Sequence, residues 1–166
     1  RHINHKGYAI YKRLANKYFD ALVKRIRAKY NSYLITTKET FTVLMAAKKK
    51  GELTINGFAA DQSPKHDKAF HWQEFMNIKV PVHTGAELLA KKLDMAVVFL
   101  KVKKLKRGYY EATIETITKT PREYKDYDIT DIFLKRLEAQ IYEAPEYYLW
   151  THKRWKHRDK VPENFR

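Results

Sequence analysis

Apolar side chains recur at steps of three and four residues near the start of the chain, and this spacing predicts a helix over residues 10–30. Basic residues such as Lys17 and Arg27 occupy the other faces of this helix. A short strand is expected to follow over residues 33–35. The apolar positions of the stripe are Tyr11, Leu14, Tyr18, Leu22 and Ile26.

Two capping boxes mark the starts of further helices. Thr36 and Glu39 stand three residues apart ahead of an apolar run, and so do Thr84 and Glu87. In a capping box the two side chains exchange hydrogen bonds with the backbone of the first helical turn. We therefore predict helices that run to about residues 50 and 93, and Gly51 suits the C-terminal cap of the first.

Apolar runs of strand length account for most of the rest of the chain. Residues 53–60, 95–102 and 109–118 are predicted strands, and residues 103–108 are a predicted basic turn. Thr130 is placed to cap a last helix, which Pro145 ends. The order of elements predicts an α/β fold with a mixed, largely parallel sheet flanked by helices.

Composition narrows the class of protein. The 166 residues suit one domain, and 34 Lys and Arg against 19 Asp and Glu give a formal net charge of +15. This charge favours anionic partners such as nucleic acid, an anionic membrane surface, phosphorylated lipid or an acidic carrier protein. The chain has no Cys, which excludes disulfides and thiol nucleophiles. No apolar run approaches the roughly 20 residues that span a bilayer.

The loop that starts at Asp61 is the first candidate site, because functional residues of α/β sheets gather at the carboxyl ends of strands. A carboxylate there can orient a base or a substrate. Asp, Ser and Pro are also ordinary turn residues, so a plain turn is the simpler interpretation of residues 61–64. Nearby His66, Asp67 and His71 lack the helical spacing of a zinc site, and no metal site is predicted.

Two basic segments are further candidates. Arg25 and Arg27 can bind a phosphate or stabilise an oxyanion, and cations at a helix C-terminus are equally expected from the helix dipole. The tail over residues 147–156 mixes aromatic and basic residues, including Trp150 and Trp155. This mixture suits a membrane interface or single-stranded nucleic acid, and it also suits packing of the aromatic rings on the domain.

The tail over residues 144–156, Ala-Pro-Glu-Tyr-Tyr-Leu-Trp-Thr-His-Lys-Arg-Trp-Lys, resembles the closing signature of the lipid A biosynthesis lauroyl/myristoyl acyltransferases. Tyr147 departs from the Gln of that signature. Asp61-Gln62-Ser63-Pro64 resembles a shortened form of the family's Asp-Gln/His-Asp-x-x-Pro loop, and residues 25–27 resemble its Arg-x-Arg element. The resemblance extends over essentially the whole chain, as the C-terminal part of a single acyltransferase domain over residues 1–166.

The resemblance implies transfer of a fatty acyl chain from acyl carrier protein to a hydroxyl of a lipid A precursor. The wider glycerolipid acyltransferase superfamily uses a His with an acid five positions later. None of the seven His residues has an acid at that position, so the general base and a membrane anchor are expected upstream of Arg1, and the chain alone is expected to be inactive.

The resemblance also assigns residues. Arg25 and Asp61 carry over as catalytic candidates, and no cofactor is implied. The implied partners are acyl carrier protein, an anionic glycolipid and the cytoplasmic face of the bacterial inner membrane, without nucleic acid. Two alternatives stay open, namely another glycolipid or aminolipid acceptor and a basic nucleic-acid-binding module. The implied substrate-binding residues are Arg27, Gln62, Pro64, Arg154 and Lys156, and those at the membrane interface are Trp150 and Trp155.

Overall fold

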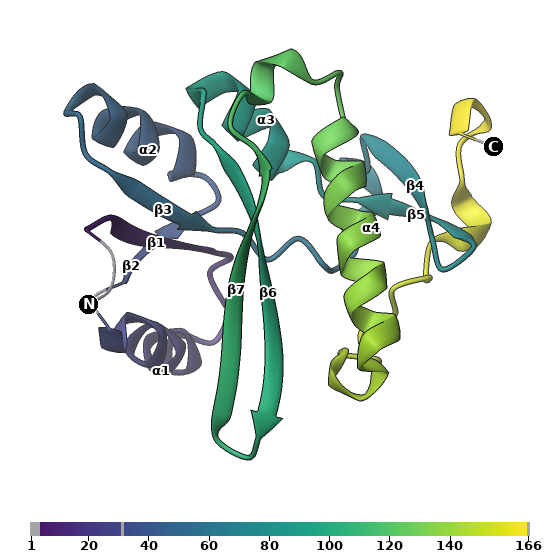
Figure 1. The fold of residues 1–166 in the computed structure, drawn as a ribbon, viewed down its shortest axis with the longest axis horizontal. Helices are drawn as coiled ribbons and strands as arrows, with labels where there is room; N and C mark the ends of the chain where they lie inside the picture. Colours follow the sequence, from purple (N-terminus) through teal and green to yellow (C-terminus); the bar gives the residue numbers. More distant parts are fainter. Residues whose placement is uncertain (1–3, 31, 166) are drawn as a thin grey trace. The chain divides into compact units, whose positions relative to one another are not determined.

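The computed structural model describes residues 4–30 and 32–165, which divide into two compact units. Unit 1 is Arg1–Ala59 and unit 2 is Ala60–Arg166. Both units combine helices with strands, which confirms the α/β class (Figure 1).

Unit 1 is built on a three-stranded parallel sheet with the order β2-β1-β3. β1 (Lys6–Tyr11) lies between β2 (Tyr33–Thr36) and β3 (Thr54–Gly57), and Tyr8 is paired with Tyr33 on one side and Asn56 on the other. Parallel neighbours require crossover connections, which the two helices of the unit supply. Residues at the carboxyl ends of β1 and β2 therefore lie at the same edge of the sheet.

Helix α1 (Lys17–Arg27) is shorter than the spacing predicted, because the predicted helix start lies in β1. Asn16 caps α1 by accepting hydrogen bonds of 3.0 Å from the backbone N–H groups of Tyr18 and Phe19. Among the residues of α1, all of which are described, only Asp20 is buried. The predicted apolar stripe is thus largely open to solvent, and Tyr18 is 91% exposed.

Helix α2 (Thr40–Lys49) begins later than predicted, because its N-cap is Glu39 and not Thr36, and Glu39 makes no side-chain cap hydrogen bond. The Glu39 carboxylate accepts from the backbone N–H and the hydroxyl of Thr36, at 3.0 and 2.6 Å. At the other end Gly51 adopts φ +67°, and the N–H of Glu52 reaches back to the carbonyl of Ala47. This arrangement is a Schellman motif, which explains why a glycine follows the helix.

Unit 2 contains two antiparallel hairpins. β4 (His71–Phe75) and β5 (Ile78–Val82) were not predicted, and they are joined by two residues with positive φ, Met76 and Asn77. β6 (Val97–Lys106) pairs with β7 (Tyr109–Thr118), so most of the predicted basic turn is strand.

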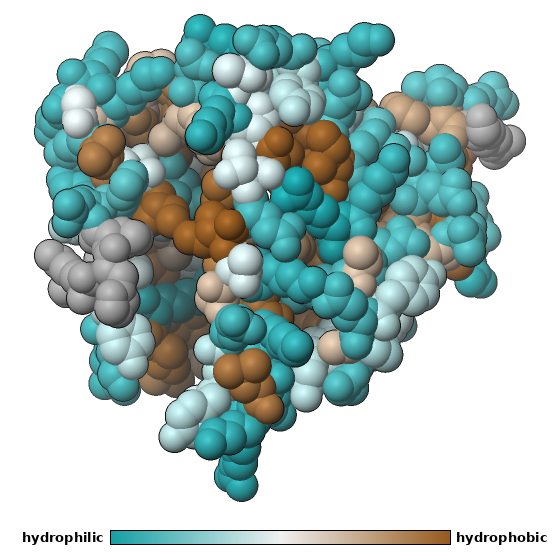
Figure 2. All heavy atoms as spheres, in the orientation of Figure 1, coloured by the Kyte–Doolittle hydropathy of each residue, from teal (hydrophilic) through white to brown (hydrophobic). Residues whose placement is uncertain are grey.

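Near the open end of the β6–β7 hairpin, one face is buried and the other is not. Phe99 and Ile117 are buried beneath helix α4 (Asp128–Glu143), whereas the paired residues Leu100 and Ile114 are 57% and 58% exposed. Figure 2 shows hydrophobic atoms along this hairpin and a hydrophilic tip.

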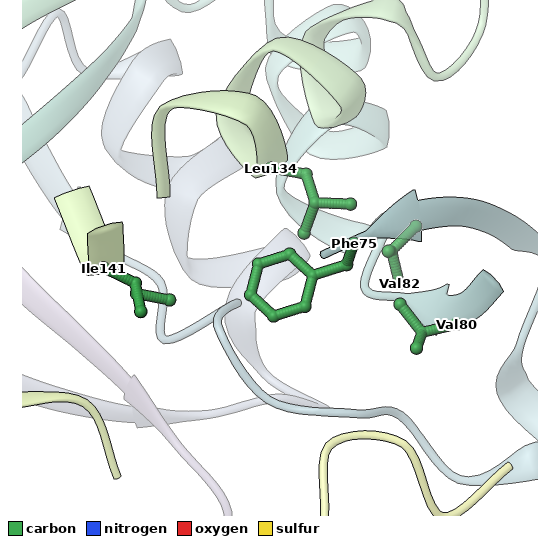
Figure 3. Close-up of a cluster of buried hydrophobic side chains, with 5 residues drawn as sticks. All are labelled: Phe75, Val80, Val82, Leu134 and Ile141. Atoms are coloured by element: carbon green, nitrogen blue, oxygen red, sulfur yellow. The ribbon is translucent and has the colours of Figure 1, made fainter. Parts of the chain in front are cut away.

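Helix α4 also closes the main core of unit 2. Leu134 and Ile141 project from it toward Phe75, Val80 and Val82 of the β4–β5 hairpin, and all five are almost completely buried (Figure 3). These two clusters place α4 between the two hairpins.

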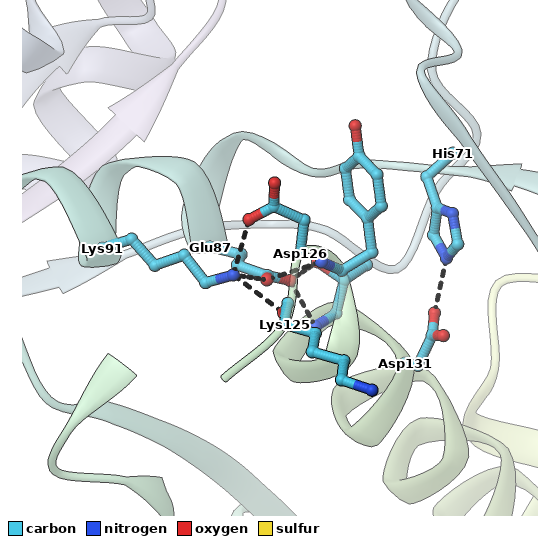
Figure 4. Close-up of polar contacts among 8 residues, drawn as sticks. His71, Glu87, Lys91, Lys125, Asp126 and Asp131 are labelled. Carbon is cyan, nitrogen blue, oxygen red and sulfur yellow. Dashed lines mark hydrogen bonds and ion pairs between the residues drawn. The ribbon is translucent and has the colours of Figure 1, made fainter. Parts of the chain in front are cut away.

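Helix α3 (Gly85–Leu93) begins and ends close to its predicted bounds, but the predicted capping box is wrong. Thr84 makes no side-chain cap hydrogen bond. Glu87 instead turns toward α4, where its carboxylate accepts from Tyr127 N–H, Thr130 N–H and the Thr130 hydroxyl at 2.7–2.8 Å (Figure 4).

No helix among residues 4–30 and 32–165 combines the length and apolarity that crossing a bilayer requires.

Candidate functional site

The loop that contains Asp61 begins unit 2. Strand β3 ends at Gly57, earlier than predicted, and residues 58–65 lie outside the described helices and strands. Asp61 is partly buried, Gln62 is exposed and Pro64 is buried. This loop therefore depends on side-chain contacts rather than on a backbone ladder for its position.

The tail after α4 folds back on unit 2 as a series of tight turns. Trp155 stacks on Phe75 with ring centroids 6.0 Å apart, and its indole N–H donates to the Phe75 carbonyl at 3.3 Å. Trp150 stacks on Trp155 at 6.2 Å and remains 48% exposed. The structure thus gives Trp155 a packing role, while the ring of Trp150 is open to solvent; their assignment to a membrane interface stays a prediction.

Ser63 joins the loop to the tail. Its backbone N–H donates to Nε2 of His152 at 3.0 Å, and its hydroxyl donates to the Arg154 carbonyl at 2.8 Å. The same hydroxyl oxygen accepts from Nη1 of Arg154 at 3.0 Å. The two segments of the predicted site, about ninety residues apart in sequence, therefore meet through one serine.

Arg154 is fully buried, with 0% exposure. Nη1 also donates to the Pro81 carbonyl at 2.9 Å, and the guanidinium carbon lies 5.2 Å from the centre of the Phe75 ring. Nε and Nη2 have no hydrogen-bond partner among the described residues. Arg154 therefore has no exposed surface in this structure, and its contact with a substrate stays a prediction.

Asp61 lies within the electrostatic reach of several side chains that titrate. Burial raises the pKa of Tyr148, and Asp61 adds to that rise. Partial burial lowers the pKa of His83 and of His152; Arg154 lowers both further and Asp61 opposes the change. The hydroxyl of Tyr148 points at the Asp61 carbonyl at 3.5 Å, which is a weak contact. The Asp61 carboxylate thus lies within electrostatic reach of the buried Arg154 guanidinium.

A second candidate lies within unit 1, at the carboxyl ends of β1 and β2. A pocket of about 470 Å³ is open to solvent there, and the exposed Arg25 comes to it from the last turn of α1. The lining residues are Tyr11, Arg13, Lys24, Arg25, Ala28, Leu34, Thr36 and Glu39.

The charges of this pocket leave Arg25 free for a ligand. Lys24 is paired with Asp20 at 3.0 Å, and hydrogen bonds from Thr36 hold the pKa of Glu39 below its usual range. Arg25 makes no ion pair with an acidic side chain within residues 4–30 and 32–165, so its guanidinium is available to an anionic group. Arg27 and Lys156, both predicted to bind substrate, are exposed, the first on α1 and the second in the tail.

The predicted catalytic residues lie in different units, Arg25 in unit 1 and Asp61 in unit 2. Their joint action in catalysis stays a prediction.

The histidines near the loop have structural partners. His71 Nε2 lies 2.8 Å from the Asp131 carboxylate, and its ring stacks on Tyr127 with centroids 4.4 Å apart (Figure 4 shows the pair of His71 and Asp131). Within residues 4–30 and 32–165, no group of three or more His, Asp or Glu side chains is arranged to hold a metal ion.

Ser63 and His152 were not among the site residues predicted from the sequence. His152 is part of the tail signature, and Ser63 occupies the position where the loop departs from the longer family form. Those two signals were present, but nothing in the sequence indicated that the two residues contact each other. Arg13, in the unit 1 pocket, carried no signal of its own.

Comparison with known protein families adds one match. The model of the bacterial lipid A biosynthesis acyltransferases matches residues 2–157. The matched range includes the Asp61 loop, Arg25 and the tail as far as His157. No curated protein matches the chain.

Proposed function

The chain belongs to the bacterial lipid A biosynthesis acyltransferase family, and on that premise we propose that it contributes to transfer of a fatty acyl chain from acyl carrier protein to a hydroxyl of a lipid A precursor. The observation that carries the proposal is the contact between the Asp61 loop and the tail signature through Ser63. The two motifs that resemble this family in sequence form one structural site.

The reaction replaces the thioester bond of the acyl donor with an oxygen ester bond to the acceptor. The acceptor oxygen loses its proton to a general base and attacks the thioester carbonyl carbon, which gives a tetrahedral oxyanion. The carbon–sulfur bond then breaks, and the thiolate takes up the proton. Positively charged donors near the developing oxyanion lower the barrier to the first step.

We assign Arg25 to the anionic part of this reaction. Its guanidinium is exposed at the mouth of the unit 1 pocket and can bind the oxyanion or a phosphate of the acceptor. Asp61 is assigned as the second acid of the site, which orients the base or the acceptor hydroxyl. None of the seven His residues has an acid five positions later, so none of them is assigned as the general base.

Acyl carrier protein and an anionic membrane surface are the proposed partners. Both attract the net charge of +15, and the cytoplasmic face of the bacterial inner membrane is the proposed place of action. Helix α1 supports the second partner, because its exposed Tyr18, Phe19 and Ile26 stand among basic residues. A lipid A precursor is the proposed acceptor; another glycolipid or an aminolipid is the competing one.

Acyl transfer from acyl carrier protein, measured with the full-length protein that contains this chain, tests the proposal. We expect Asp61→Asn and Arg25→Gln to lower kcat/KM by about 100-fold each, because each removes a charge that acts on the reacting groups. Residues 1–166 alone should show no turnover.

Lys17→Gln is the matched control, since it removes an exposed cation from the opposite end of the same helix. It should keep at least half of the wild-type activity. Full activity of both site variants, or turnover by residues 1–166 alone, would contradict the assignment.

A further inference from the structure

Three hydrogen bonds between the Asp61 loop and the tail involve one residue of the loop, Ser63. Ser63 uses its N–H, its hydroxyl proton and its hydroxyl oxygen, and all three bonds go to His152 or Arg154 at 2.8–3.0 Å. Residues 58–65 have no helix or strand to hold them. These three hydrogen bonds therefore help to hold Asp61, which lies two residues before Ser63, in its position.

We propose that Ser63, His152 and Arg154 form a latch that positions Asp61 for the acyl-transfer step. The proposal rests on the function proposed above, and it assigns the three residues as positioning residues. None of them is proposed to touch the substrate. The latch predicts that turnover, rather than binding of the acyl donor, depends on these contacts.

Arg154 is chemically specific for this role. A buried cation costs free energy that an apolar side chain of similar size avoids, so packing alone does not require an arginine. Nη1 of Arg154 holds Ser63 and the Pro81 carbonyl together, and the carbonyl of the same residue accepts from Ser63. Serine and arginine thus form a closed ring of hydrogen bonds that fixes both the loop and the end of β5.

His152 makes the latch sensitive to protonation. Its Nε2 can accept the Ser63 N–H only when that nitrogen carries no proton. Burial lowers the pKa of His152 from 6.5; the charges of Lys156 and Arg154 lower it further and that of Asp61 opposes them. His152 is therefore neutral and accepts the Ser63 N–H above about pH 6.5. This hydrogen bond is lost as the pH falls through the pKa of His152 in the folded protein, which is below 6.5.

Two variants of His152 separate a positioning role from a general loss of fold in the full-length protein. His152→Ala removes the acceptor and should lower kcat by about 10- to 100-fold, with KM for the acyl donor changed less than about twofold. His152→Gln supplies a carbonyl acceptor that does not titrate. It should restore most of kcat and reduce the fall in kcat that wild type shows as the pH drops below about 6.5.

Ser63→Ala and His157→Gln complete the set. Ser63→Ala removes the hydroxyl from the ring and should lower kcat by about tenfold. His157→Gln changes another partly buried tail histidine, which has no hydrogen-bond partner among the described residues, and should leave both kcat and its pH dependence unchanged.

Hydrogen exchange of the Ser63 amide gives a readout that does not depend on activity. Exchange should be faster in His152→Ala than in wild type, and His152→Gln should restore protection. Unchanged exchange together with unchanged kcat in His152→Ala and Ser63→Ala overturns the latch and leaves the proposed function standing. Absence of acyl transfer in wild type, with Ser63 exchange still dependent on His152, rejects the proposed function and upholds the contacts of the latch.

Discussion

The Glu87 carboxylate shows how much one buried residue can determine. It is 2% exposed, accepts three hydrogen bonds from the first turn of α4 and lies 3.0 Å from the ammonium of Lys91. Burial tends to lower the pKa of Lys91, but Asp126 and Glu87 outweigh it and raise the pKa. A residue of α3 therefore supplies the N-terminal cap that α4 lacks in its own sequence.

We expect Glu87→Gln to lower the free energy of unfolding by about 2–4 kcal/mol, because it removes a buried charge that satisfies several donors and leaves Lys91 without that partner. Urea unfolding at neutral pH measures the change. Glu163→Gln, which neutralises an exposed acid, should change stability by less than about 0.5 kcal/mol. Equal stability of Glu87→Gln and wild type would mean that α4 does not depend on this cap.

Helix α1 departs from the usual burial pattern of an amphipathic helix, in which the apolar side chains are buried and the charged ones are exposed. Its apolar residues are open to solvent, with Ile26 61% and Phe19 56% exposed, while a charged residue, Asp20, is buried. Asp20 accepts from the Leu14 N–H at 2.9 Å and pairs with Lys24, and these contacts lower its pKa. Exposed apolar side chains beside cations fit the interface of an anionic bilayer.

The double variant Tyr18→Ser/Ile26→Ser should reduce binding to anionic vesicles by about tenfold, since it removes two apolar side chains that would enter the interface. Co-sedimentation with vesicles that contain phosphatidylglycerol measures the change. Leu88→Ser, at a residue of α3 that is 48% exposed, should bind as wild type does. A loss of equal size in Leu88→Ser would show that general apolarity, and not α1, governs the binding.

The sequence predicted element ends best where local chemistry defines them. Gly51, with its positive φ, ends α2 as expected, and β7 has the predicted limits, whereas the N-cap of α2 is Glu39 and not the predicted Thr36. The start of α1 was wrong because Ile10 and Tyr11 continue the helical spacing although they pair in a sheet. Strands β4 and β5 escaped notice because their turn, Met76-Asn77, contains no glycine.

The candidate site was predictable only in part, for a related reason. The Asp61 loop and the tail each have a recognisable local sequence, but their contact spans about ninety residues and has no local signal. The burial of Arg154 was equally hidden, because Lys153 and Lys156 beside it suggested a solvated cluster. Long-range contacts of this kind are set by the packing of α4 and the two hairpins, which spacing along the chain does not describe.

At the scale of the whole molecule, charge is the most distinctive property. A net charge of +15 implies attraction to any anionic surface, and such attraction is screened when the ionic strength rises. Electrostatic attraction and apolar insertion are therefore separable contributions to the proposed membrane binding.

Raising NaCl from about 0.05 M to about 0.5 M should weaken binding to anionic vesicles by more than about tenfold, because the Debye length falls below the distance between surface charges and lipid headgroups. Vesicles of zwitterionic lipid are the control and should bind weakly at both concentrations. Binding to anionic vesicles that does not change with salt would show that apolar contacts alone hold the protein at the surface.

The folded-back tail has a consequence for the gene. Phe75 is covered by three tail residues that follow α4, namely Tyr148, Arg154 and Trp155. A premature stop codon shortly after Glu143 would remove these residues and expose the core around Phe75. Such a product would expose a large aromatic surface and spend more time unfolded, which makes it a substrate for cellular proteases. A nonsense mutation between codons 144 and 148 should therefore act as a null allele through loss of the protein itself, even though α1–α4 and β1–β7 would have been translated.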